Sequence, residues 1–277
     1  MNIIYRGILF RVLKNDLKNK VISYKWVILL SIFFVINYLT LINIGSYSKS
    51  VNLSFNIWDY ILYILNNSSY YLYIYIPLSV FICIDIVSSS FGDISLIRYN
   101  SIVMWILNKL ISIHLNCLIL VMWLLITVLL TSFNITYEME WSSFMYTTEY
   151  LFNKDILIVF HPIIAVILSM IQLVFSLSIF SVIITLGYIY INSKIFYLIP
   201  SLVLWVLTIF SSKSTKVLFE DSYIYLENIF LFSKSVNLNK FGFFIAMFFF
   251  SIVNVFIFIL CKLKLKNKDL YIGNKYE

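Results

Sequence analysis

Charged side chains are scarce in this chain: Asp, Glu, Lys and Arg together make up 12% of its 277 residues, about half of the share in an ordinary soluble domain. Apolar residues reach 62% and aromatic residues 19%. So little charge cannot cover the surface of a water-soluble globule of this length, and so apolar a chain does not remain disordered. We therefore predict a polytopic integral membrane protein.

Glycine, proline and catalytic motifs are also scarce. Three prolines and six glycines exclude collagen-like or linker-rich material. The glycines form neither G-x-x-x-x-G-K-[ST] nor G-x-G-x-x-G, and H-E-x-x-H and G-x-S-x-G are absent. We therefore predict that the chain is not an enzyme and holds no cofactor, so that any ATP and Mg²⁺ that drive its work are bound by another chain.

Cysteines are few, with no C-x-x-C or C-x-x-H spacing. Cys83, Cys117 and Cys261 lie in or at the ends of apolar runs. An odd number of such thiols predicts neither a disulfide framework nor a zinc site. We expect them to be small apolar packing residues.

Long apolar runs dominate what the sequence does contain. A bilayer core of about 30 Å requires about 20 apolar residues per helix. Six runs approach this length, so the predicted fold class is all-α, a single transmembrane domain over residues 1–277 with six spans. These are Trp26–Gly45, Tyr70–Ser88, Leu110–Phe133, Ile163–Ile191, Ile195–Phe210 and Phe241–Cys261.

The basic residues are distributed unevenly between the two sides of this topology. The net charge is +7, and 14 of the 20 Lys and Arg residues fall on the side that holds both termini. Cytoplasmic loops carry such an excess, so both termini are expected in the cytoplasm, as an even number of spans requires. Because the charges lie in short patches between apolar runs, we predict no nucleic-acid partner. The abundance of Ile, Asn, Lys and Tyr is typical of an AT-rich bacterial genome, which places the chain in a bacterial cytoplasmic membrane.

The segment before the first span, residues 1–25, has an apolar face at helical spacing and six basic residues. This pattern favours an amphipathic helix lying in the inner membrane interface, with its lysines facing lipid headgroups. The alternative is a basic, weakly ordered leader. The apolar face consists of Ile4, Ile8, Leu9, Val12 and Leu13.

Three segments are expected on the opposite, outer side. In Ser46–Ser69, the run Ile57–Leu62 suggests a helix in the interface. Asn134–Asp155 is acidic and aromatic, as expected for a belt at the outer headgroups. Residues 211–240 are too apolar for a simple loop, and we predict a semi-buried segment with short helices before the last span.

Two ionisable residues lie within predicted spans, Asp85 late in the second and His114 early in the third. Buried charge is costly in a membrane, so such residues are candidates for a proton relay or a coupling-ion site. The favoured alternative is a carboxylate near the headgroups that is paired locally or reaches the interface. The two side chains form a possible intramembrane polar pair.

The stretch at residues 92–108 predicts an amphipathic cytoplasmic helix that leads into the third span. Its apolar positions recur at helical spacing, and its opposite stripe offers polar and aromatic side chains to a cytoplasmic partner. The stripe consists of Arg98, Ser101, Trp105 and Asn108.

Here the sequence I-R-Y-N-S-I-V-M-W-I-L-N-K-L resembles the I-R-x-x-S-R-x-x-W-x-x-x-K segment of ABC transporter permeases of the type-two exporter class. In that family this segment is the coupling helix, which contacts the ATPase subunit. The six spans, the basic N-terminal helix, the internal termini and the semi-buried segment before the last span are similar too. Ile102 departs from the pattern, since family members often carry a basic residue there. The matching positions are Arg98, Ser101, Trp105 and Lys109.

The resemblance implies the permease subunit of an ATP-driven exporter that moves hydrophobic or amphipathic cargo, such as an antimicrobial peptide, a lipid-like molecule or a drug. It implies as partners an ABC ATPase subunit, a second permease copy or a homologous permease, and membrane lipids. Two alternatives remain at this point: a non-transporting membrane scaffold or sensor subunit, and an ion-coupled secondary transporter.

Overall fold

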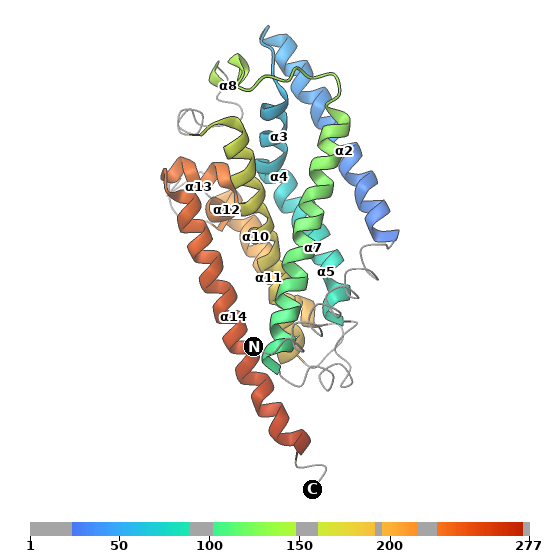
Figure 1. Ribbon diagram of the computed structural model, residues 1–277, viewed down its shortest axis with the longest axis vertical. Helices are drawn as coiled ribbons and strands as arrows, with labels where there is room; N and C mark the ends of the chain where they lie inside the picture. Colours follow the sequence, from blue (N-terminus) through green and yellow to red (C-terminus); the bar gives the residue numbers. More distant parts are fainter. Residues whose placement is uncertain (1–23, 89–101, 148–159, 192–195, 215–225, 274–277) are drawn as a thin grey trace, which may run out of the picture.

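The computed structural model describes an all-helical bundle, and its described residues contain no β-strand (Figure 1). The scarcity of glycine and proline, together with the long apolar runs, accounts for this because few residues interrupt the intrahelical hydrogen bonds that lipid makes obligatory. The described residues are 24–88, 102–147, 160–191, 196–214 and 226–273.

Four helices are long and apolar enough to cross a membrane. The helix α10 is central, because 61% of its 18-residue apolar stretch is buried inside the bundle. The corresponding share in α14 is only 22%. It contacts both α7 and α14, between which it lies in Figure 1. The four helices are α2 (Tyr24–Ser50), α7 (Ile102–Thr131), α10 (Pro162–Tyr190) and α14 (Gly242–Gly273).

The second predicted span begins earlier than expected and is bent. The helix α3 (Ile57–Asn66) is followed by a second apolar helical part, Ser68–Ile84, which begins with the short α4 (Ser68–Tyr70). The bend between α3 and this second part is 44°. The run Ile57–Leu62 is helical, and Tyr60 and Leu62 within it are fully buried in the bundle; its place in the membrane interface stays a prediction. The outer loop before α8 (Ser143–Thr147) covers the start of α3 and removes it from the surface: Asn56 Nδ2 donates to Glu140 O at 2.6 Å, and Ser142 Oγ donates to the carboxylate of Asp59.

Between α4 and α5 (Ile76–Ser88) the chain forms one π-helical stretch, η1 (Tyr71–Tyr75). In this pattern the N–H of Ile76 donates to Tyr71 O, five residues back. The next carbonyl, of Leu72, would need the N–H of residue 77, which is a proline and has none. Trp205 Nε1 donates to Leu72 O instead, at 2.7 Å, and thereby ties this stretch to α11.

Six spans are not confirmed. The helix α11 (Ile199–Ser214) has 16 residues, about 24 Å of helix, which is shorter than a hydrocarbon core of about 30 Å. It follows a short 3₁₀ turn, η2 (Phe196–Leu198). The described residues therefore contain four membrane-spanning candidates, or five if the bent pair around α3 and α5 counts as one span.

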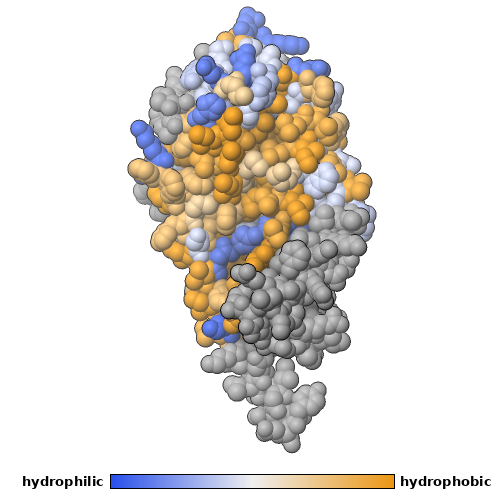
Figure 2. Space-filling model, in the orientation of Figure 1, coloured by the Kyte–Doolittle hydropathy of each residue, from blue (hydrophilic) through white to orange (hydrophobic). Residues whose placement is uncertain are grey.

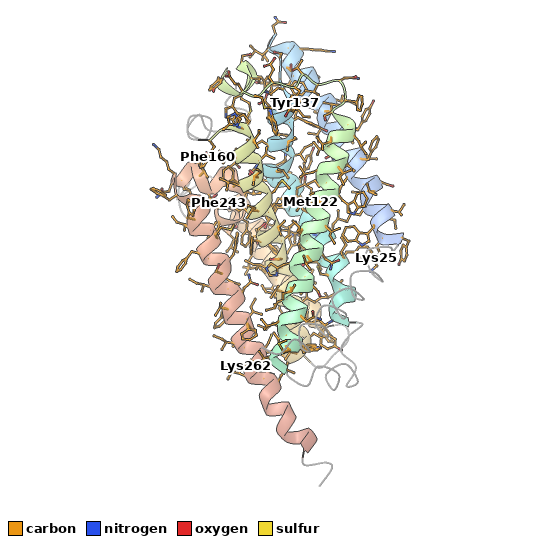
Figure 3. All side chains as sticks on the ribbon, in the orientation of Figure 1. Lys25, Met122, Tyr137, Phe160, Phe243 and Lys262 are labelled. Carbon is orange, nitrogen blue, oxygen red and sulfur yellow. The ribbon has the colours of Figure 1, made fainter. Side chains whose placement is uncertain are left out.

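The predicted semi-buried segment before the last long helix is described over residues 226–240, and its external position stays a prediction. It contains two short helices, α12 (Leu226–Phe230) and α13 (Phe232–Leu238). Phe232 is buried and its ring contacts those of Phe160 and Phe243, with centroids 5.6 and 6.2 Å away (Figure 3). Residues 215–225 lie outside the described residues, as do the predicted N-terminal helix up to residue 23 and residues 92–101 of the predicted coupling helix.

The two ends of the bundle differ in their side chains. Tyr137 lies near the upper end in Figure 3, whereas Lys25, at the lower end of α2, and Lys262 on α14 lie further down. Between the ends, the face shown in Figure 2 is largely hydrophobic, and hydrophilic residues gather at its upper end. This apolar belt supports a membrane protein.

The packing of α5 against α7 makes a direct prediction about two cysteines. The thiols of Cys83 and Cys117 are buried and hydrogen-bonded to each other, although nothing in their sequence spacing indicated that they would meet. Dibromobimane, which fluoresces strongly only after it has joined two thiols, is expected to link them within one chain in permeabilised membranes. Cys261→Ser should retain this signal, whereas Cys83→Ser should lose it. A signal unchanged in Cys83→Ser would contradict the packing of α5 on α7.

Candidate functional site: the buried polar face of α7

The predicted partner-binding residues fall into two groups. Arg98 and Ser101 lie outside the described residues, whereas Trp105 and Lys109 belong to the first turns of α7. Both described side chains are buried, Trp105 with no exposed surface and Lys109 with 1%. The expected exposed position of Trp105 is therefore not observed, because residues 102–108 are continuous with the long helix and turn this face toward the bundle.

Trp105 and Lys109 belong to a longer polar stripe along the inner side of α7. Its members recur every three or four residues, which places them on one helix face. None is more than 2% exposed. Polar side chains buried within a membrane bundle are costly and therefore mark candidate functional positions. The stripe consists of Trp105, Asn108, Lys109, Ser112 and Asn116.

The neighbouring face of α10 is polar as well. Ser181 and Thr185 are fully buried there, and the side chain of Ser181 lies beside Cys117 of α7. Because α7 and α10 run in opposite directions, the pairing of Cys117 with Ser181 brings Thr185, one turn further along α10, to the level of Ser112. Hydroxyl and amide groups of two helices thus surround one region of the bundle interior.

Three polar atoms of this region have no hydrogen-bond partner among the described residues: Ser112 Oγ, Asn116 Oδ1 and Thr185 Oγ1. Buried polar groups are almost always satisfied by protein or by ordered water. The arrangement can therefore hold water molecules or a small polar group beside the buried Lys109. No group of His, Cys, Asp and Glu side chains in the described ranges is suited to hold a metal ion.

The predicted polar pair of Asp85 and His114 stays a prediction. Asp85 lies in α5, but its side chain is outside the described residues. His114 Nδ1 is 2.8 Å from Leu110 O, and its ring packs against Phe175 at a centroid distance of 5.6 Å. A carbonyl oxygen only accepts hydrogen bonds, so Nδ1 carries the ring proton in this arrangement.

A second buried polar cluster, which sequence reasoning missed, fixes α12 and α13 to the bundle. Asn66 at the end of α3 accepts a hydrogen bond from the N–H of Ser233 at 2.9 Å and donates to Ser169 Oγ at 3.1 Å. Gln172 of α10 donates to Ile229 O at 2.7 Å and to Ser235 Oγ at 3.1 Å. The only sequence signal was the presence of an amide residue within each apolar run.

No family model, no curated protein and no solved structure matches this chain. Its function must consequently be inferred from its own residues and their arrangement.

Proposed function

We propose that this chain is the membrane-spanning permease subunit of an ATP-driven exporter in a bacterial cytoplasmic membrane. The observation that carries the proposal is the sequence from Ile97 to Leu110, which resembles a coupling helix and leads into the buried polar face of α7. The chain has no nucleotide-binding motif of its own, so its energy must come from a partner. ATP and Mg²⁺ would be bound by two ABC ATPase subunits.

The continuity of α7 supports mechanical coupling. Its 30 residues form a single rod of about 45 Å, and it packs against α2, α5, α10 and α14. A displacement at its first turn is thus transmitted to most of the bundle. Buried Trp105 anchors the start of this rod within the bundle, and the contact with the ATPase is assigned to the preceding residues Arg98 and Ser101.

The proposal includes a second permease, either identical or homologous, with the cargo path between the two. The face of the bundle shown in Figure 2 is largely hydrophobic between its ends, which supports hydrophobic or amphipathic cargo such as an antimicrobial peptide, a lipid-like molecule or a drug. Co-expression with an ABC ATPase of the same genome, followed by purification and measurement of cargo-stimulated ATP hydrolysis, tests the whole proposal. Failure to recover any ATPase would overturn it.

Arg98→Ala is expected to weaken binding of the ATPase subunit without preventing insertion of the permease. Truncating a central interface arginine costs about 2 kcal/mol, which corresponds to roughly a thirtyfold loss of affinity. Lys49→Ala is the matched control, because Lys49 is exposed at the other end of α2 from Lys25. Recovery of the tagged ATPase should fall for Arg98→Ala alone, and equal recovery from the two variants would contradict the coupling assignment.

The buried stripe of α7 favours one second candidate, an ion-coupled transporter, since a lysine among hydroxyl and amide groups is suited to a coupling-ion site. Transport in inverted vesicles separates the two. An exporter of the ABC class loses transport when the partner ATPase is inactivated, whereas an ion-coupled transporter loses it when an ionophore collapses the gradient. A scaffold or sensor subunit would transport under neither condition.

A further inference from the structure

A large pocket lies on the side of the bundle formed by α7, α10 and α14, away from the polar stripe of α7. Its volume is about 730 Å³, within the range of small-molecule sites. Most of the residues that line it are aliphatic, and several are open to the outside, including Ile111 at 41% and Val255 at 58% exposure. Because these residues belong to the apolar belt of membrane-spanning helices, the pocket opens sideways toward lipid.

Three polar side chains line this otherwise apolar pocket: His114, Ser251 and Asn254. Each donates a hydrogen bond to a carbonyl of its own helix. His114 Nδ1 donates to Leu110 O at 2.8 Å, Ser251 Oγ to Met247 O at 2.8 Å and Asn254 Nδ2 to Phe250 O at 2.9 Å.

These bonds determine what the pocket offers to a ligand. With its proton on Nδ1, His114 presents Nε2 as an acceptor, and no hydrogen bond to Nε2 occurs among the described residues. Asn254 Oδ1 is buried and has no donor in the described part of the chain. A ligand group that donates hydrogen bonds therefore complements the pocket.

The charge of the pocket restricts the donor further. None of the described residues that line it is Asp, Glu, Lys or Arg, so a cationic amine would enter without a counter-charge, which is costly in an apolar environment. A neutral hydroxyl carries no such penalty. Along the helix axes, His114 lies about 8 Å from Lys109 and Asn254 about 12 Å from Lys262. On the proposed topology, in which these two lysines lie near the inner headgroups, the acceptors lie below headgroup depth, where a hydroxyl on a long hydrocarbon chain can reach them.

We propose that this pocket binds a neutral membrane lipid with a hydrocarbon chain and a free hydroxyl group, which donates to His114 Nε2 or Asn254 Oδ1. The inference is independent of the exporter proposal. It requires no ATPase and no second permease.

The test uses the purified full-length chain and a long-chain alcohol that carries a photoreactive diazirine, with the corresponding methyl ether as the donor-free probe. The alcohol is expected to label peptides of α7, α10 and α14 about tenfold more strongly than the ether at equal concentration. Unlabelled hexadecanol should compete. Since this comparison uses the unaltered protein, it does not depend on the folding of any variant. Equal labelling by the two probes would overturn the proposal.

Variants assign the label to the pocket. Met170→Trp places a larger side chain in the pocket lining and should abolish labelling by the alcohol, whereas Leu129→Trp, at an exposed position on α7 outside the pocket, should leave it intact. The pair His114→Phe and Asn254→Leu should remove the preference for the alcohol over the ether. Undiminished labelling of Met170→Trp at the same peptides would contradict the assignment.

A second copy of the chain is the competing occupant. Ile171 lines the pocket and is exposed, so Ile171→Cys in a background without the native cysteines reports on this face. A bismaleimide is expected to leave this variant monomeric in membranes. Efficient formation of covalent dimers would assign the face to a permease contact and overturn the lipid proposal.

Discussion

Gly242→Ala is expected to be among the most destabilising single substitutions in this chain. Gly242 begins α14 directly after α13, and a Cβ atom at this position would lie 1.8 Å from the backbone oxygen of Ser235. That separation is far below van der Waals contact, so α13 must move away from α14. Overpacking of this kind costs about 3 kcal/mol, and the displacement would also break the contact between Ser235 and Gln172.

The measurement is the loss of helical circular dichroism on heating, which reports unfolding without any reaction of the buried cysteines. The melting midpoint of Gly242→Ala in dodecyl maltoside should fall clearly below that of the unaltered protein. Gly45→Ala is the matched control: Gly45 lies within α2, and a Cβ atom added there would meet no neighbouring atom within 4 Å, so alanine should stabilise that helix by up to about 1 kcal/mol. Similar midpoints for the two variants would show that α13 does not pack against the start of α14.

Asn66→Leu and Gln172→Leu are expected to release α12 and α13 from the bundle. Asn66→Leu leaves the buried N–H of Ser233 without its acceptor, and Gln172→Leu leaves Ile229 O without its donor. An unsatisfied buried group costs roughly 1–3 kcal/mol. Because both side chains hold the same segment, the double variant should lose less stability than the two single variants lose in sum.

Ser178→Ala is the control for this pair. Ser178 is as buried as Gln172 and lies on the same helix, but its Oγ donates to Phe175 O within α10 and does not join two segments. Its melting midpoint should stay close to that of the unaltered protein. Fully additive losses from Asn66→Leu and Gln172→Leu would indicate that the two amides act on separate parts of the structure.

The buried network around Asn66 also indicates why the polar interior could not be predicted from the sequence. Ionisable side chains such as Asp85 and His114 stand out within an apolar run because a buried charge is costly. Ser112, Asn116 and Thr185 are neutral, and such residues occur in many membrane helices without function. Only the packing of α7 against α10 shows that their polar atoms share one region and lack partners among the described residues.

The sequence by itself determined the environment of the chain and the long helices α2, α7, α10 and α14. The length of an apolar run follows from consecutive residues alone. Each such run forms a helix, because a peptide group without a hydrogen bond is costly in lipid. It also predicted that residues 211–240 would contain short semi-buried helices. It did not determine the second and fifth spans, where the covered start of α3, the π-helical stretch before Pro77 and the short α11 depend on contacts with distant segments.

The tertiary structure alone decided which helix faces are internal. In a soluble protein, the water-facing side of a helix is polar, so the spacing of the apolar residues along the sequence shows which side is buried. In a membrane, lipid is as apolar as the protein core, so the sequence of α2 or α14 looks apolar on every side. For that reason the burial of Trp105, the meeting of Cys83 with Cys117 and the lipid-facing pocket at His114 became visible only once the helices were packed together.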